Sequence, residues 1–287
     1  MVRFPLHRSS DPPMTAFWRR LRFGLSTLLG VRLLGFFIPY RYAQGVRPLD
    51  YPALRPLFEA SRPAFGRVLA AIETYADDLR RIRDGQGPAR FDQDWFPRLD
   101  AAAAYAIVRR GKPQRIVEIG SGHSTRFLAQ AVHDGDLITT ITCIDPAPRA
   151  ALERLKVEHR PVLLQDAEAR IFESLGAGDV LFIDSSHIAM PGTDVDRLFL
   201  DVLPRLAGGT LVHIHDITLP DRYPDPWAWR AYNEQIPVGT LLQGGGYELL
   251  FASHFVASTR EIHAGGILAE LPLSPGAHET SLWLRKR

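Results

Sequence analysis

Cysteine is almost absent from this 287-residue sequence, and so is net charge. Cys143 is the only cysteine, which excludes an intrachain disulfide and a cysteine-based zinc site and favours a reducing, cytoplasmic compartment. The 34 Lys and Arg residues nearly balance the 32 Asp and Glu residues, leaving a net charge of +2. Because a nucleic-acid-binding surface requires a marked basic excess, we expect a small-molecule substrate and no nucleic-acid partner.

An uninterrupted apolar run long enough to cross a membrane is also missing. The most apolar stretch, residues 23–40, contains Arg32 near its middle and three glycines. It is too short and too charged for a membrane span, and Arg32 breaks the pattern of a signal peptide. We therefore expect this segment to be retained in the protein.

The basic residues are concentrated near the N-terminus. Residues 1–49 carry eight arginines against one acid, Asp11, whereas the rest of the chain is slightly acidic. One interpretation is an arm or lid that packs on the main domain or on a second subunit of a homo-oligomer. The other is a basic amphipathic patch, residues 14–42, that makes a peripheral contact with the inner face of a membrane. The sequence is compatible with both.

The pattern of the chain changes at Pro113. Before it, apolar periodicity predicts helices over residues 64–84 and 97–110. After it, we expect strands at 115–119, 138–144, 161–164, 179–184, 210–215, 247–257 and 280–285, and helices at 124–132, 148–155, 167–175 and 194–206. Such alternation is typical of a Rossmann-like, doubly wound α/β sheet of mostly parallel strands. We therefore divide the chain into a basic arm and helical lid, residues 1–112, and an α/β domain, residues 113–287.

The clearest motif is a glycine loop between the first expected strand and the helix after it. It consists of Glu118, Gly120, Ser121, Gly122 and Ser124. The glycines allow a sharp turn and a close approach to a ligand, and the helix N-terminus offers free N–H groups. A dinucleotide site would have a third glycine in place of Thr125, and Glu118 would repel its pyrophosphate. We therefore expect a ligand with an ammonium group and no phosphates.

Acidic residues follow the next two expected strands. Asp145 lies 25 residues after Gly120, where a carboxylate can accept both hydroxyls of a ribose. Asp166 and Ala167 follow the third strand, where they can reach the edge of an adenine. Ligands of doubly wound sheets bind at the carboxyl ends of the parallel strands, so we expect these residues to line one crevice.

The fourth and fifth expected strands end in carboxylates and histidines: Asp184, His187, His215 and Asp216. Two carboxylates suit a hard divalent cation such as Mg²⁺, and an imidazole from His215 shifts the preference towards Mn²⁺, Fe²⁺ or Zn²⁺. A metal-free, hydrogen-bonding site is the alternative. His187 has the chemistry of a general base, while strand alternation places His213 in the core.

The order of these motifs resembles the class I S-adenosylmethionine-dependent methyltransferases over residues 113–287. The resemblance implies that the glycine loop holds the methionine end of S-adenosylmethionine, that Asp145 holds the ribose, and that Asp166 and Ala167 hold the adenine. Asp184, after the fourth strand, then lies beside the cofactor. The last two expected strands resemble the family's final β-hairpin, which implies one C-terminal antiparallel strand within the sheet.

Within this family, the ends of the fourth and fifth strands resemble the metal-dependent branch that methylates hydroxyl groups of small molecules. The resemblance implies Mg²⁺ or Mn²⁺ on Asp184 and Asp216, and we add His215 as a candidate third ligand. From their position at the strand ends we expect Asp184 and His187 to be the catalytic residues. His215 stands where this branch commonly has an acid. Two alternatives are a nicotinamide-dependent oxidoreductase, which Glu118 and Thr125 disfavour, and a non-catalytic, membrane-associated scaffold of the same fold.

Overall fold

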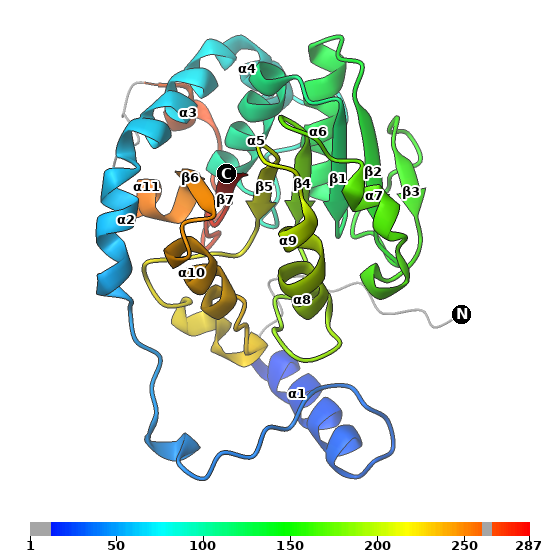
Figure 1. The fold of residues 1–287 in the computed structure, drawn as a ribbon, viewed down its shortest axis with the longest axis vertical. Helices are drawn as coiled ribbons and strands as arrows, with labels where there is room; N and C mark the ends of the chain where they lie inside the picture. The colour runs from blue at the N-terminus through cyan, green and yellow to red at the C-terminus, as the bar shows by residue number, and fades with distance from the viewer. Residues whose placement is uncertain (1–12, 260–265) are drawn as a thin grey trace.

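A seven-stranded sheet forms the centre of the computed structural model, which describes residues 13–259 and 266–287 (Figure 1). The strands are β1 (Arg115–Ile119), β2 (Thr140–Ile144), β3 (Glu158–Arg160), β4 (Val180–Ile183), β5 (Leu211–Ile214), β6 (Tyr247–Ala252) and β7 (Leu282–Lys286). Their order is β3-β2-β1-β4-β5-β7-β6, and β7 runs antiparallel to both of its neighbours. This confirms the predicted doubly wound sheet with a C-terminal antiparallel strand.

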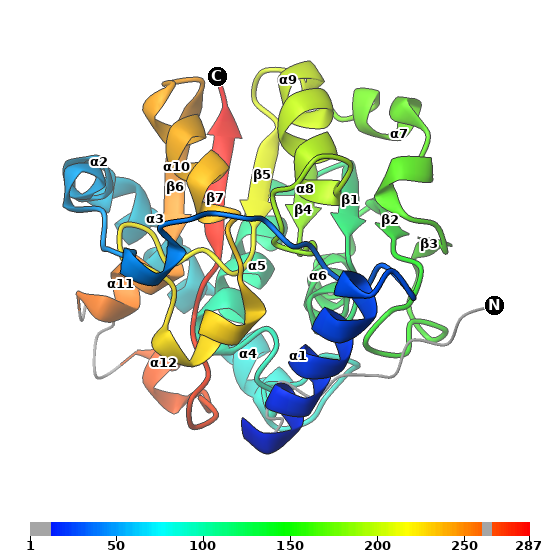
Figure 2. The same cartoon turned by 90° about the horizontal axis from the view of Figure 1, so that it is seen from below.

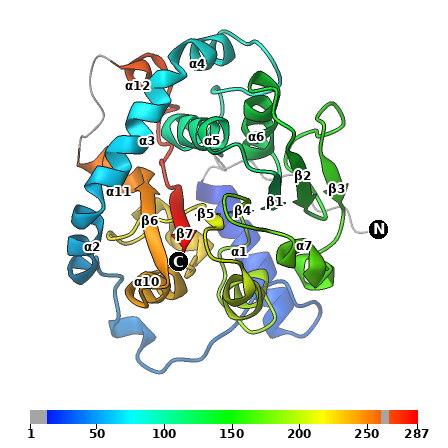
Figure 3. The same cartoon turned by 45° about the horizontal axis from the view of Figure 1, so that its top comes forward.

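Helices cover both faces of the sheet. Figure 3 shows α5 and α6 on one face and α7 and α10 on the other. The α-helices are α1 (Pro13–Leu28), α2 (Arg55–Ala60), α3 (Arg62–Thr74), α4 (Ala76–Arg83), α5 (Arg98–Gly111), α6 (His123–Asp134), α7 (Ala169–Glu173), α8 (Asp194–Arg197), α9 (Leu203–Arg205), α10 (Gln235–Gln243), α11 (Ser253–Ser258) and α12 (Ile267–Glu270). Short 3₁₀ turns lie at η1 (Ala43–Gly45), η2 (Pro52–Leu54), η3 (Leu164–Asp166) and η5 (Asp225–Arg230), and a π-helical turn, η4 (Leu198–Val202), joins α8 to α9.

The helices that precede the sheet in sequence share its hydrophobic core. Buried side chains of α3 and α5 belong to the same cluster as those of the strands. Every residue of β4 is buried, as expected of a parallel strand covered on both faces. At the centre of the core the rings of Phe182 and His213 stack with their centroids 3.7 Å apart, and His213 is fully buried as predicted.

Several predicted boundaries are wrong. The third strand is Glu158–Arg160 rather than 161–164, because β3 is an edge strand with exposed polar side chains, whereas the apolar residues after it belong to a turn. No helix forms over 148–155, where the chain makes turns and bends. The helix expected over 64–84 is divided at Tyr75, and the strand expected over 247–257 ends at Ala252, where α11 follows.

The segment before α2 lies apart from this core. Figure 1 shows α1 below the rest of the fold, and Figure 2 shows the stretch between α1 and α2 crossing in front of the strands in that view. Most side chains from Phe17 to Leu49 are exposed. No helix within residues 13–259 or 266–287 has the length and apolar character of a membrane span.

A glycine turn fixes the position of β1 relative to β4. Gly120 follows β1 with φ of +75°, in the left-handed region that favours glycine. A Cβ atom at this position would overlap the carbonyl oxygen of Asp184, which follows β4. The turn therefore needs glycine for two independent reasons, its backbone conformation and the contact between the two strand ends.

We predict that Gly120→Ala lowers the free energy of unfolding more than Gly178→Ala does. Gly178 has φ of +85° and no atom within 4 Å of the place that an added methyl group would take. Its substitution therefore costs only the strain of holding an alanine in the left-handed conformation, about 1–2 kcal/mol. Overlap with Asp184 adds roughly 1–3 kcal/mol at Gly120. Urea unfolding of the two variants measures the difference, and equal losses would contradict the close contact.

Candidate active site

Glu118 lies beneath the glycine turn, where it is fully buried. Its two carboxylate oxygens accept hydrogen bonds of 2.6 Å from the hydroxyls of Ser124 and Thr125, and the thiol of Cys143 lies 3.3 Å away. Burial raises the pKa of Glu118 to about 7. The carboxyl group thus ties β1 to the first turn of α6, and Glu118 is not among the residues that line the cavity described next.

A cavity of about 470 Å³ opens at the carboxyl ends of β1, β2 and β4. This volume lies within the range of about 300–1,000 Å³ found for small-molecule sites. Its lining includes four of the predicted site residues: Gly120, Ser121, Asp145 and Asp184. The structure therefore brings the expected strand ends together in one crevice.

Asp145 is held in place at the wall of this cavity. One carboxylate oxygen accepts a 2.7 Å hydrogen bond from the backbone N–H of Ser121, and the other accepts one of 2.7 Å from Ala147. After β3 the cavity is lined by Leu164 and Gln165. The predicted adenine residues Asp166 and Ala167 lie outside the lining, as do Gly122 and Ser124, and Asp166 is exposed.

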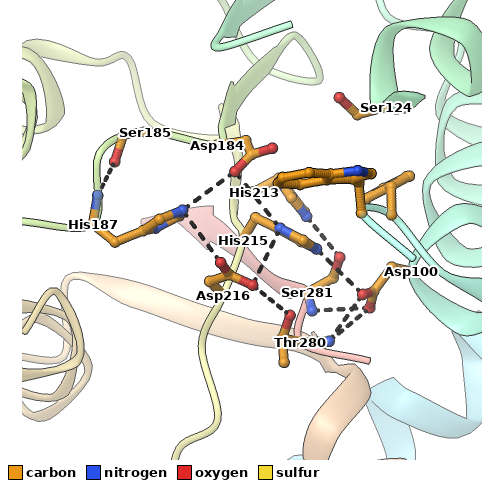
Figure 4. Close-up of polar contacts among 12 residues, drawn as sticks. Asp100, Ser124, Asp184, Ser185, His187, His213, His215, Asp216, Thr280 and Ser281 are labelled. Carbon is orange, nitrogen blue, oxygen red and sulfur yellow. Dashed lines mark hydrogen bonds and ion pairs between the residues drawn. The ribbon is translucent and has the colours of Figure 1, made fainter. Parts of the chain in front are cut away.

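Four side chains at the ends of β4 and β5 converge beside the cavity (Figure 4). We call Asp184, His187, His215 and Asp216 the carboxylate–histidine cluster. The Nε2 atom of His187 lies 3.3 Å from Asp184 Oδ1 and 3.4 Å from Asp216 Oδ2. The Nδ1 atom of His215 lies 3.7 Å from Asp184 Oδ1 and 3.6 Å from Asp216 Oδ1. Asp184 lines the cavity and also pairs with both histidine rings, so it connects the cavity to the carboxylate–histidine cluster.

Each ring of the cluster is held from behind by a second, fully buried carboxylate. Glu234 lies 2.8 Å from Nδ1 of His187, and Asp100 lies 3.3 Å from Nε2 of His215. Asp100, on α5, also accepts hydrogen bonds from the backbone N–H groups of Thr280 and Ser281 (Figure 4). The orientation of each ring is therefore fixed. One ring nitrogen contacts a buried carboxylate, and the other nitrogen faces Asp184 and Asp216.

Sequence reasoning missed both of these outer carboxylates. Asp100 carried a signal, because it is a charged residue on the apolar, alanine-rich face of an expected helix. Glu234 carried none, since it follows a loop whose path the sequence does not reveal. Both reach the cluster from elements far away in the chain.

The charges of the cluster are strongly coupled. Burial lowers the pKa of His187, but hydrogen bonds to Asp184 and Glu234 outweigh burial and hold it well above the usual 6.5. Burial also opposes a charge on His215, yet Asp216 and Asp100 raise its pKa to about 10. The hydrogen bonds from both rings outweigh burial at Asp184 and hold its pKa well below 3.8. The surrounding carboxylates therefore favour the protonated form of both rings.

Backbone strain accompanies this arrangement. His187 and Asp216 have φ of +61° and +55°, in the left-handed region that residues with a side chain rarely adopt. Such conformations cost about 1–3 kcal/mol each and concentrate at functional sites. Both residues direct their side chains into the cluster, where Nε2 of His187 lies 3.4 Å from Asp216 Oδ2.

The predicted metal site is not formed as expected. Within the described parts of the chain, no group of three or more His, Cys, Asp or Glu side chains is arranged to hold a metal ion. Asp184, His215 and Asp216 are close together, with Nδ1 of His215 3.7 Å from Asp184 Oδ1 and 3.6 Å from Asp216 Oδ1. Because an imidazole must lose its proton to bind a metal, a cation would have to displace the proton that Asp216 and Asp100 favour on His215.

Aromatic side chains of the segment after β5 form a wall beside the cluster. The ring of Tyr232 lies 4.6 Å from that of His187, and Trp227 packs edge-on against Tyr232. Arg230 lies over the Trp227 ring and places Nη1 3.8 Å from Asp216 Oδ2. The segment after β5 therefore reaches the site.

We predict that Glu234→Gln lowers the pKa of His187, because the variant removes the carboxylate that stabilises the protonated ring at Nδ1. The titration of the His187 ring protons by NMR measures this pKa. Glu248→Gln is the matched control, since Glu248 pairs with Arg285 at the surface. An unchanged pKa in Glu234→Gln, with the fold intact by circular dichroism, would contradict the contact.

Comparison with known proteins supports the chemistry implied by the motifs. Residues 117–217 match a family model described as a methyltransferase domain. A search of curated proteins gave no match. The S-adenosylhomocysteine-bound methyltransferase PaMTH1 of Podospora anserina is 15% identical, with coverage of 88% of this chain and 100% of that chain and a TM-score of 0.41.

Two further solved structures show a comparable likeness. A methyltransferase of Geobacter sulfurreducens is 16% identical, with coverage of 83% of this chain and 98% of that chain and a TM-score of 0.39. The branched-chain polyamine synthase of Thermus thermophilus is 14% identical, with coverage of 75% and 64% and a TM-score of 0.43. Likeness at this level does not indicate a substrate. Residues 117–217 are therefore similar to a methyltransferase domain, and the strand order agrees with the doubly wound sheet that the motifs imply.

Proposed function

We propose that this protein transfers a methyl group from S-adenosylmethionine to a hydroxyl oxygen of a small molecule. One observation carries the proposal: Asp184 belongs both to the wall of the cavity and to the carboxylate–histidine cluster. A cofactor in the cavity would therefore have its reactive end beside His187. A sulfonium cation is also favoured there, because Asp184 and Asp216 supply negative charge.

The cofactor would lie along the strand ends. Asp145 would accept the ribose hydroxyls once it exchanges its bonds to backbone N–H groups, and Gln165, which lines the same cavity, would contact the adenine. Ser121 and Gly120 would face the methionine end. Glu118 would act indirectly, by fixing the turn through Ser124 and Thr125.

His187 is the proposed proton acceptor. In the free protein the neighbouring carboxylates hold the pKa of its ring well above 6.5 and so oppose its action as a base. A sulfonium beside Asp184 would offset that negative charge and lower the pKa of His187, freeing Nε2. As the acceptor oxygen attacks the methyl carbon, the carbon–sulfur bond breaks and its electron pair stays on sulfur. The hydroxyl proton moves to Nε2, and Glu234 stabilises the resulting charge through Nδ1.

A cation-assisted reaction is the second candidate, because Asp184, His215 and Asp216 are the donor types that Mg²⁺ or Mn²⁺ would use. The ion pairs within the cluster favour the metal-free reaction, and no step above passes through a metal. Loss of turnover in EDTA, restored by Mg²⁺ or Mn²⁺, would replace the metal-free proposal with this one.

Binding tests the cofactor site directly. We predict that calorimetry detects S-adenosylhomocysteine binding but no NAD⁺ binding. Asp145→Ala should weaken the binding of S-adenosylhomocysteine by about 1–3 kcal/mol, which is the scale of hydrogen bonds to a charged group. Asp166→Ala is the matched control, because Asp166 is exposed outside the cavity lining. Equal effects of the two variants would contradict the assignment of the ribose to Asp145.

The pH dependence tests the role of His187. Because the base must be unprotonated, turnover should rise with pH and then level off. The pKa seen in kcat/KM for S-adenosylmethionine reports the free protein and should lie above 6.5, whereas the pKa seen in kcat should be lower because the sulfonium is then bound. A His187→Gln variant that keeps full turnover from pH 6 to 9 would contradict the proposal.

A further inference from the structure

The N-terminal arm, residues 17–42, presents an apolar surface that the rest of the protein leaves uncovered. In α1 the residues Phe17, Trp18, Leu21, Leu25 and Leu28 recur at three- and four-residue steps and form one stripe. Each is between 39% and 61% exposed. A surface helix normally turns such a stripe towards the core, so the orientation of α1 is reversed.

The opposite side of α1 faces the protein instead. The guanidinium of Arg19 lies 5.2 Å above the ring of Trp229, in η5. On the same side, the hydroxyl of Ser26 donates a hydrogen bond to the carbonyl of Arg32, and the hydroxyl of Thr27 accepts one from the N–H of Leu34. The contact of Arg19 with Trp229 joins this side of α1 to η5, whereas the bonds of Ser26 and Thr27 fold the following segment back on the helix. The apolar stripe points to solvent.

The stripe continues beyond the helix. Residues 29–38 add six large apolar side chains, each at least 54% exposed, in a segment without regular secondary structure. Continuous exposed apolar surface of this kind marks an interaction site in a soluble protein. The occupant therefore has to cover both a helix face and an irregular segment.

The charge of the arm selects among possible occupants. Residues 13–49 contain six arginines and no acidic residue. Pairing with the same surface of a second copy would oppose arginines with arginines, which is unfavourable. An anionic bilayer instead supplies negative headgroups to the arginines and an apolar interior to the stripe. Trp18, Tyr40 and Tyr42 suit the boundary between the two, because their rings combine an apolar body with a polar edge.

We propose that the arm docks the protein on the surface of an anionic lipid bilayer, with the α1 stripe inserted among the acyl chains near the headgroups. This binding is independent of the methyl-transfer proposal. In this orientation η5, which carries Trp229 and Arg230, lies behind α1 on the side away from the bilayer, and Arg230 in turn lies beside Asp216.

Vesicle flotation of the whole protein tests this docking. Phosphatidylcholine vesicles containing about a third phosphatidylglycerol should bind it at about 0.1 M salt, and binding should fall sharply at about 1 M salt, where charges are screened within roughly 3 Å. Vesicles of phosphatidylcholine alone should bind it far more weakly. Equal binding to both vesicle types, or to neither, would overturn the proposal.

Two pairs of variants separate the apolar and the charged contributions. Leu25→Asp should weaken binding more than about tenfold, the equivalent of one buried leucine, while Leu200→Asp, an exposed leucine outside the arm, should not. Arg20→Gln with Arg22→Gln should weaken it about thirtyfold, at roughly fivefold for each arginine. Arg110→Gln with Arg154→Gln removes the same charge elsewhere and should have little effect.

Light scattering of the same variants distinguishes a lipid surface from a second copy. If the wild type forms a dimer that Leu25→Asp dissociates, and neither protein binds vesicles, the stripe belongs to a subunit interface and the proposal fails. If the oligomeric state is the same in both and only vesicle binding changes, the proposal stands.

Discussion

The contact between the end of β1 and the end of β4 is the constraint on which the site depends. Gly120 lies against the backbone of Asp184, and a side chain at this position would separate the two strand ends. The same residue, Asp184, then points its carboxylate at two histidine rings. One close backbone contact thereby sets the distance between the cavity for a ligand and the groups that can react with it.

The site also unites parts of the chain that are distant in sequence. Asp100 comes from α5, before the sheet, and joins His215 of β5 to the backbone of residues 280–281. Glu234 comes from the segment after η5 and fixes His187. A core shared between the N-terminal helices and the sheet makes this possible, because it places α5 rigidly against the strands. The chemistry of the cluster is therefore a property of the whole fold.

The sequence alone predicted the features that short, local residue patterns encode. The parallel sheet, Asp145 at one strand end and the convergence of Asp184 with His187, His215 and Asp216 follow from strand order, since carboxyl ends meet at one edge. The partners of those groups do not follow, because Asp100 and Glu234 approach through tertiary packing. Glu118 illustrates the same limit: its presence beside the glycine loop was readable, but not that its carboxyl group turns away from the cavity towards α6. The arm was recognised as basic and apolar, whereas the outward orientation of its stripe required the structure.

A crystal structure of the protein with S-adenosylhomocysteine tests the central claim most directly. The account predicts adenosine between Asp145 and Gln165, with the sulfur atom facing Asp184 and the His187 ring. The two rings should keep their contacts with Glu234 and Asp100. A ligand bound outside this cavity, or bound with its adenine against the carboxylate–histidine cluster, would contradict the account.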